Sequence, residues 1–219
     1  MNFDFAQIGP SIPYIMKGAL VTLQYTSLSV CFGSILGAVL AFLKQAESGF
    51  LRGFAGVYTS IFRGTPLLVQ LMLIYFATPQ LFGYKITAFE AGILAFSLNS
   101  AAYVSEVMRA GIKAVEKGQL EAAISLGLSR RQAMIDIVLP QAFKNTLPAL
   151  VNEIVDLLKE SALISVLGEA DLLRRANIVS AETYLYFEPL LVAAGMYYVM
   201  VLILTQLAST LEYRLKRSD

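Results

Sequence analysis

The sequence contains no histidine and a single cysteine, Cys31. Histidine is the side chain that most often serves as a general base near neutral pH and as a metal ligand, so its absence removes the usual candidate for both roles. One cysteine can form neither a disulfide nor a thiolate metal site within the chain. We therefore expect no metal site and no catalytic residue in this chain.

Charge is also scarce. Charged residues make up 15% of the chain and hydrophobic residues 57%, whereas a soluble domain averages about 25% charged residues. The net charge of +1 provides no concentrated basic face for nucleic acid. This composition is typical of a protein that lies in membrane lipid.

Signals for ATP hydrolysis and for a cleaved leader are missing as well. Neither Gly-Lys-Ser nor Gly-Lys-Thr occurs in the sequence, so we expect no phosphate-binding loop, and any ATP hydrolysis has to belong to another chain. We likewise expect no cofactor here. Because the N-terminus has Asp4 and no Lys or Arg before Lys17, it lacks the positive region of a signal peptide, and we expect the first apolar segment to be retained.

Five apolar segments approach the length of about 20 residues that a membrane-spanning helix needs. They are residues 15–43, 54–78, 86–108, 146–167 and 186–207. No period of 20 to 50 residues recurs along the chain, which argues against a solenoid. The sequence predicts an all-α integral membrane protein with about five transmembrane helices, folded as a single transmembrane domain over residues 1–219.

The distribution of Lys and Arg predicts the orientation in the membrane. Eleven of these residues fall in the connection 44–53, the loop 109–145 and the C-terminal tail: Lys44, Arg52, Arg109, Lys113, Lys117, Arg130, Arg131, Lys144, Arg214, Lys216 and Arg217. The connections on the other side hold four: Lys17, Lys85, Arg174 and Arg175. Because positive residues favour the cytoplasmic side, we expect the N-terminus outside and both the long loop and the C-terminus in the cytoplasm.

The long loop contains an amphipathic stretch suited to docking. Good helix formers occupy residues 119–126, where Ala122 and Ala123 provide a small face that another surface could approach closely. Gly127 is well placed to end this helix in a left-handed conformation. A second short helix is expected from Ser129, a suitable N-cap, until Pro140 and Pro148 interrupt regular structure. The alternative is that both are ordinary interfacial helices on the lipid headgroups.

The spacing of this loop resembles the one by which permease subunits of bacterial ABC importers engage their ATPase. The resemblance rests on Glu121, Ala122, Ala123 and Gly127, followed by Ile-Val-Leu-Pro at 137–140. Three further motifs resemble the branch that transports polar, including basic, amino acids: Arg-Gly-Thr-Pro at 63–66 with Gln70, Asn-Ser-Ala-Ala-Tyr at 99–103 with Glu106, and Leu-Pro-Gln-Ala at 139–142 with Leu147, Pro148 and Asn152. Together these motifs cover residues 63–153.

The resemblance implies a transport subunit rather than an enzyme. In that family two permease subunits assemble with two cytoplasmic ATP-binding subunits, which hold ATP and Mg, and with an extracytoplasmic solute-binding protein. The resemblance therefore implies a multi-pass subunit of the bacterial cytoplasmic membrane that carries a small-molecule amino acid. We expect the second permease to be an identical chain.

The fourth apolar segment carries a polar stripe that can be interpreted without the family. Its members are Asn152, Glu153, Asp156, Lys159 and Glu160, which fall within an arc of about 120° on a helix. Ionisable groups at membrane depth normally face a bundle interior or a wet cavity and mark a transport route. Three carboxylates against one amine leave a negative surplus, which a cationic substrate would offset.

Two interpretations of the stripe stay open. In one, the charges form an internal network, with Lys159 paired to one carboxylate and Arg63, Arg174 or Arg175 to another. We expect this for Lys159 and Glu160, which lie nearer the outer end. For Glu153 and Asp156 we favour contact with substrate, because a guanidinium could reach both carboxylates at i and i+3.

Other polar residues could complete a substrate site. Asn99 and Ser100 bring polar side chains to the middle of the third segment, although a packing role between helices is equally open. Tyr103, Phe62 and Gln70 could form walls of the same cavity, but aromatic residues in membrane spans more often pack or lie at the interface. The sequence thus favours a permease for a polar, most plainly a basic, amino acid of the arginine, lysine or histidine type. An ion-coupled secondary carrier and a non-transporting scaffold are the alternatives.

Overall fold

The computed structural model describes residues 4–216, and within this range every regular element is a helix. In chain order these are α1 (Phe5–Ile8), the 3-10 turn η1 (Gly9–Ser11), α2 (Ile12–Leu43), α3 (Gly49–Gly64), α4 (Leu67–Phe82), α5 (Ala88–Ala114), α6 (Lys117–Ser125), α7 (Arg130–Gln132), the π-helical segment η2 (Ala133–Val138), α8 (Leu139–Glu160), the 3-10 segment η3 (Ser161–Leu167), α9 (Leu172–Thr183) and α10 (Phe187–Lys216). The predicted all-α class is confirmed.

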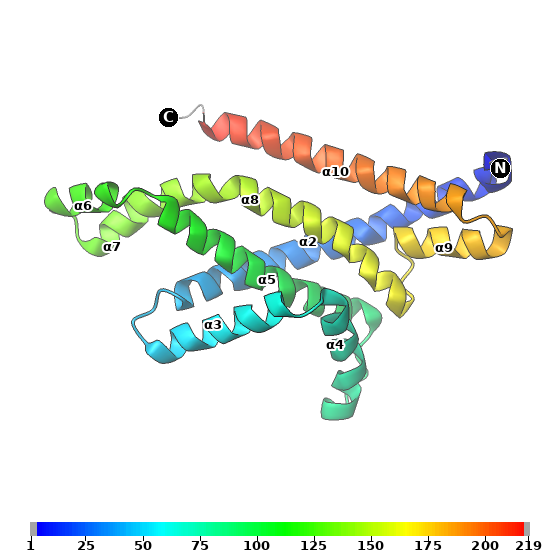
Figure 1. Ribbon diagram of the computed structural model, residues 1–219, viewed down its shortest axis with the longest axis horizontal. Coiled ribbons are helices and arrows are strands. Elements are labelled where there is room, and N and C mark those ends of the chain that lie inside the picture. The colour runs from blue at the N-terminus through cyan, green and yellow to red at the C-terminus, as the bar shows by residue number, and fades with distance from the viewer. Residues whose placement is uncertain (1–3, 217–219) are drawn as a thin grey trace.

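Helices α2, α5, α8 and α10 form an elongated bundle, with α6 and α7 at one end and α9 with the N-terminus at the other (Figure 1). α5 packs most extensively against α2 and then against α8. Small residues allow these close approaches. A Cβ added at Gly33 of α2 would lie 2.8 Å from the Ser100 Cβ, and one at Gly111 of α5 would lie 2.1 Å from the Thr146 Cγ2. Larger side chains there would separate α5 from α2 and from α8, the helix that carries the polar stripe.

The second predicted span is not one straight helix. α3 and α4 meet at an angle of 104°, and in Figure 1 α4 turns away from the bundle. Thr65 at the junction is extended, with φ −123° and ψ 145°. This conformation follows from Pro66, because the ring of a proline disfavours helical geometry in the residue before it. The prediction of an uninterrupted helix over residues 54–78 was therefore wrong.

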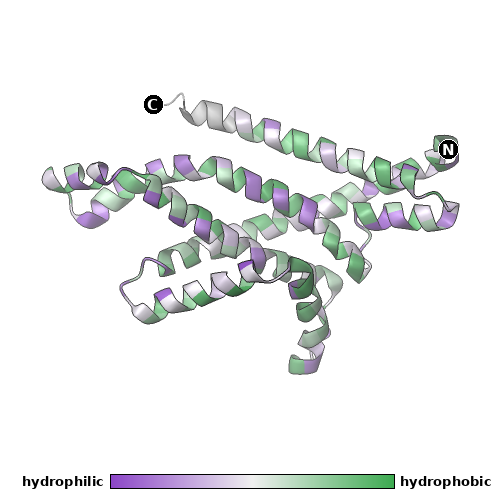
Figure 2. Cartoon of the chain, in the orientation of Figure 1, coloured by the Kyte–Doolittle hydropathy of each residue, from purple (hydrophilic) through white to green (hydrophobic). Residues whose placement is uncertain are grey.

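Length and apolar composition alone identify two membrane-spanning helices among the described residues, Phe5–Leu43 and Phe187–Thr210, or three when the bent pair α3 and α4 counts as one span. α5 with 27 residues and α8 with 22 residues are also long enough to span a membrane. Figure 2 shows hydrophilic residues along α8, which explains why composition alone does not select it. The predicted count of about five spans agrees with this arrangement.

The prolines of the loop do not interrupt helical structure as the sequence suggested. Pro140 lies in the first turn of α8 and Pro148 lies inside it. The π-helical segment η2 leads directly into α8. Such a widened turn accommodates the loss of an i to i−4 bond, because its N–H groups bond five residues back. The helix that carries the stripe therefore begins at Leu139, earlier than residue 146.

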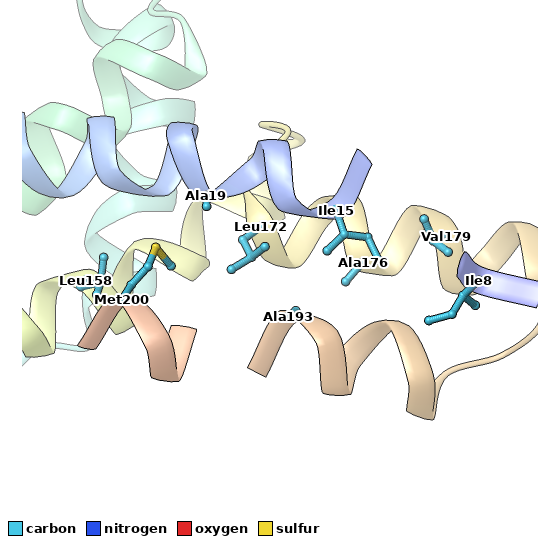
Figure 3. Packing of buried hydrophobic residues seen from close by; sticks show 9 residues of the cluster. All are labelled: Ile8, Ile15, Ala19, Leu158, Leu172, Ala176, Val179, Ala193 and Met200. Atoms are coloured by element: carbon cyan, nitrogen blue, oxygen red, sulfur yellow. The ribbon is translucent and has the colours of Figure 1, made fainter. Parts of the chain in front are cut away.

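The end of the bundle opposite α6 is held by α9, which was not predicted as a helix. Nine buried residues from the N-terminal segment, α8, α9 and α10 pack together there (Figure 3): Ile8, Ile15, Ala19, Leu158, Leu172, Ala176, Val179, Ala193 and Met200. Asp171 begins α9 by accepting from the N–H groups of Leu173 and Arg174. A Cβ at Gly18 would lie 2.6 Å from the Leu172 Cα, so α2 and α9 meet at this glycine.

Candidate functional site

The polar stripe of α8 faces α5 across a cavity of ≈ 270 Å³. Asn99 and Tyr103 of α5 line one side. The α8 side is lined by Glu153, Asp156, Lys159 and Glu160. The structure thus brings together Asn99, Tyr103, Glu153 and Asp156, four residues that the sequence proposed for one site. Three carboxylates and one amine share this space, so the cavity carries a negative surplus.

One contact of the internal network that the sequence left open is present in the stripe. The Lys159 Nζ donates to the Asp156 Oδ1 at 2.6 Å, a contact between residues one helical turn apart. Lys159 therefore pairs with Asp156, a residue assigned to substrate. Both partners remain accessible, with side chains 55% and 61% exposed. Arg63 and Arg175, two of the arginines named as alternative partners for a second carboxylate, contact Glu106 and the carbonyls of Ala170 and Tyr14.

Gln70 and Phe62 belong to the bend between α3 and α4 rather than to the cavity lining. The Gln70 Nε2 donates to the Phe62 carbonyl at 2.8 Å and to the Thr65 carbonyl at 3.0 Å. The Asn99 Nδ2 donates to the Gln70 Oε1 at 3.0 Å and to the Phe62 carbonyl at 3.1 Å. The Phe62 ring packs on Tyr58, with centroids 4.5 Å apart. Asn99 therefore connects the broken helix to the cavity wall.

Ser100 and Asn152 do not line the cavity. Ser100 is buried against Gly33 of α2, in agreement with its packing alternative. Its Oγ makes no hydrogen bond within normal distance limits, although it lies near the Glu153 carboxylate. Asn152 is exposed on α8.

A second charged cluster was missed by the sequence reasoning. The Glu106 carboxylate accepts from Lys44 and from Arg109, whose Nε and Nη2 lie 2.9 and 2.5 Å away. The Arg63 Nη1 lies 4.0 Å from the same carboxylate. Lys44 and Glu106 are 62 residues apart, so no local pattern could have paired them. Arg63 and Glu106 each belong to a motif identified in the sequence, but neither motif indicated that the two residues meet.

The candidate coupling surface is formed by α6 and the turn that follows it. Gly127 has φ +91°, which confirms the predicted left-handed conformation. The Leu128 N–H donates to the Ala123 carbonyl and the Gly127 N–H to the Ile124 carbonyl, the pair of bonds that defines a Schellman end. Glu121 and Ala122 are exposed. Ala123 is only 5% exposed, so its methyl group packs inward and is not part of the docking face as predicted. Leu126, in contrast, is 83% exposed.

Comparison with known proteins places this fold in a family of membrane transport subunits. Residues 33–217 match the family described as the binding-protein-dependent transport system inner membrane component. The match spans well over half of the chain. The protein belongs to this family.

Individual relatives give the same class. A Bacillus subtilis protein named arginine transport system permease protein ArtQ is 50% identical over 219 residues and covers 100% of both chains. A Rickettsia felis protein with the provisional name glutamine transport system permease protein GlnP is 55% identical over 206 residues and covers 94% of both. A chain in a crystal structure of an amino acid ABC transporter with histidines has a TM-score of 0.93 at 46% identity, covering 98% of this chain and 100% of that chain.

The comparisons establish an amino acid ABC transporter permease subunit of the membrane. Its relatives are permeases rather than enzymes, and the ATPase is a separate subunit. A chain of a methionine ABC transporter, at 18% identity and a TM-score of 0.78 over 92% of this chain and 96% of that chain, shares the fold. Family membership favours this class over both an ion-coupled carrier and a non-transporting scaffold.

Proposed function

We propose that the cavity between α5 and α8 is a substrate site on the translocation pathway of an ATP-driven importer, and that it prefers a cationic amino acid. The observation that carries the proposal is the excess of carboxylates in the cavity lining, which contains Glu153, Asp156 and Glu160 and one base, Lys159. A cationic side chain entering a low-dielectric site needs opposite charge close by. The names of the relatives, which refer to arginine and to glutamine, support a polar substrate.

Within this site Glu153 is the strongest candidate for contact with the positive charge. It is partly buried, whereas Asp156 is exposed and already accepts from Lys159. A substrate guanidinium or ammonium that approaches both would have to compete with Lys159 at Asp156 but not at Glu153. Asn99 and Tyr103 then face the uncharged part of the substrate from the opposite side of the cavity.

The same proposal includes the partners and the orientation. Two copies of this chain assemble with two ATP-binding subunits, which bind ATP and Mg, while this chain carries no cofactor of its own. An extracytoplasmic solute-binding protein delivers the amino acid, and the surface around Glu121, Ala122 and Gly127 contacts the ATPase. The N-terminus lies outside and the loop 109–145 lies in the cytoplasm.

The test compares uptake with assembly. The double variant Glu153→Gln with Asp156→Asn is reconstituted in proteoliposomes with the ATPase and the solute-binding protein, and arginine uptake is measured beside basal ATP hydrolysis. We expect a large loss of arginine uptake with normal assembly and normal basal hydrolysis. Full retention of arginine uptake by the intact complex would falsify the assignment of these two carboxylates. Joint loss of assembly and activity would assign them to a structural network.

A further inference from the structure

Three basic residues gather around one carboxylate, and one of them, Arg63, lies over the ring of Tyr103, which lines the cavity. Lys44 follows α2, Arg63 lies at the end of α3 and Arg109 lies in α5, and all three contact Glu106. One negative charge against three positive charges leaves a positive surplus beside a cavity that is itself negative. Lys44 and Arg109 are hydrogen-bonded to Glu106, so they account for its charge.

Of the three bases, Arg63 makes the longest contact with Glu106. Its guanidinium is 4.0 Å from Glu106, beyond hydrogen-bonding distance, and its side chain is 45% exposed. The guanidinium carbon lies 5.3 Å from the centroid of the Tyr103 ring. Tyr103 is a wall of the cavity. Arg63 therefore stacks on a residue that lines the site while its N–H donors remain largely available.

The charges around the cavity are arranged as a dipole. Arg63 lies over the ring of Tyr103, and Tyr103 shares the cavity lining with Glu153, so the guanidinium and the carboxylates lie around one cavity. Along α5, Asn99, Tyr103 and Glu106 follow one another at spacings of four and three residues and so share a face. The positive group is next to Tyr103 and Glu106, whereas Asp156, Lys159 and Glu160 continue α8 past Glu153 toward its C-terminal end. An amino acid is itself a dipole, with an anionic carboxylate and at least one cationic group.

We propose that Arg63 binds the α-carboxylate of the transported amino acid and is therefore a specificity-determining residue of this permease. The inference rests on the proposed substrate site. The planar guanidinium presents donors in a fork that matches a carboxylate with two parallel hydrogen bonds. Moving Arg63 away from Glu106 leaves that carboxylate satisfied by Lys44 and Arg109. An anchor for the α-carboxylate would suit both arginine and glutamine, the amino acids in the names of the relatives, because both carry this group.

The first test needs no variant. Binding of arginine to the detergent-purified complex of this chain with its ATPase is measured by calorimetry without the solute-binding protein, so that the selectivity of that protein does not enter. Agmatine and argininamide, which keep the guanidinium but lack the carboxylate, serve as comparison ligands. We expect each to bind about tenfold more weakly than arginine or worse, as loss of a charge-assisted hydrogen bond implies. Equal affinities for arginine, agmatine and argininamide would overturn the inference.

The second test asks whether Arg63 causes the preference for arginine over ligands that lack the carboxylate. In Arg63→Gln the preference for arginine over agmatine should disappear, and in Arg63→Lys, which keeps the charge but not the fork, it should be reduced. Arg109→Gln is the matched control, because Arg109 contacts the same Glu106 without contacting Tyr103 in the structure. An unchanged preference in Arg63→Gln, or an equal loss in Arg109→Gln, would refute a direct role for Arg63.

The design separates this inference from the proposed site. If Glu153→Gln weakens arginine binding while Arg63→Gln leaves the carboxylate preference intact, the site stands and the role of Arg63 is wrong. If neither Glu153→Gln nor Asp156→Asn changes arginine binding, the site itself is wrong and the inference falls with it. Absence of saturable arginine binding to the wild-type complex also overturns both.

Discussion

Gly127 combines a left-handed backbone with open space around it. Its φ is +91°, and a Cβ added there would meet no atom within 4 Å. A substitution would therefore act through backbone strain rather than through a steric clash, and a β-branched side chain resists this conformation most strongly. The Schellman bonds of Leu128 and Gly127 would then be weakened, and the direction in which the chain leaves α6 would change.

Gly127→Val should uncouple transport from ATP hydrolysis, because α6 would no longer end in the turn that shapes the proposed ATPase-contacting surface. Substrate-stimulated ATPase activity of purified, correctly assembled complexes measures this effect. Gly118→Val serves as a control in the same loop, since the Gly118 φ is not positive and a Cβ there meets nothing within 4 Å. Normal stimulation in Gly127→Val would contradict the coupling role.

Glu106 is the single carboxylate for three bases, and its neutralisation should destabilise the fold. In Glu106→Gln, Lys44 would keep a side chain only 9% exposed without its counter-charge. A group left without a charged partner costs about 1–3 kcal/mol or more. Thermal unfolding of the detergent-purified complex should show a lower midpoint, whereas Glu47→Gln at an exposed position should not. An unchanged midpoint in Glu106→Gln would show that the cluster contributes little to stability.

At the scale of helices, the break between α3 and α4 is the feature that most shapes the site. Pro66 makes the break necessary, and Gln70 fixes it through bonds to the Phe62 and Thr65 carbonyls. Asn99 lines the cavity and donates to the Gln70 Oε1, so it links the break to the cavity wall. The second apolar segment, which is long enough for one span, thus forms two helices. Their junction supports Asn99, one wall of the candidate site.

Gln70→Leu should destabilise this junction, because four groups would lose their hydrogen bond to a buried side chain: the Phe62 and Thr65 carbonyls, the Thr65 hydroxyl and the Asn99 amide. The expected loss is about 1–3 kcal/mol, together with weaker substrate binding through displacement of Asn99. Midpoints of thermal unfolding and arginine affinity are measured in parallel. Gln80→Leu, on the exposed face of the same helix, is the control. Equal stability of the two variants would show that Gln70 does not hold the bend.

Sequence patterns predicted the elements whose signals are local. The apolar segments that became α2, α5 and α10 were identified from length, and the left-handed Gly127 from the helix that precedes it. The bend at Thr65 was missed because the apolar count continues through Pro66. α9 was missed because it has only 12 residues, too few for a span. Lys44 pairs with Glu106 because of how the helices pack, and Lys159 selects Asp156 through its rotamer, and periodicity determines neither.

For the whole molecule, the arrangement of charge and shape points to one orientation in the membrane. α6 and α7 lie at the end of the bundle opposite α9 and the N-terminus, and α10 runs from the N-terminal end back toward the side of α6 (Figure 1). The eleven-to-four distribution of Lys and Arg predicts that the α6 end lies in the cytoplasm. Arg217 of this set lies outside the described residues.

Single-cysteine labelling tests this orientation directly. Cys31 is exposed, so each reporter is placed in a Cys31→Ser background. We expect an impermeant thiol reagent to label Ser11→Cys from outside intact cells and to label Gln119→Cys only after the membrane is permeabilised, because Gln119 lies in α6. The two positions control for each other, since both are exposed or partly exposed in the structure. Labelling of Gln119→Cys in intact cells would reverse the orientation and, with it, the assignment of the α6 surface to a cytoplasmic ATPase.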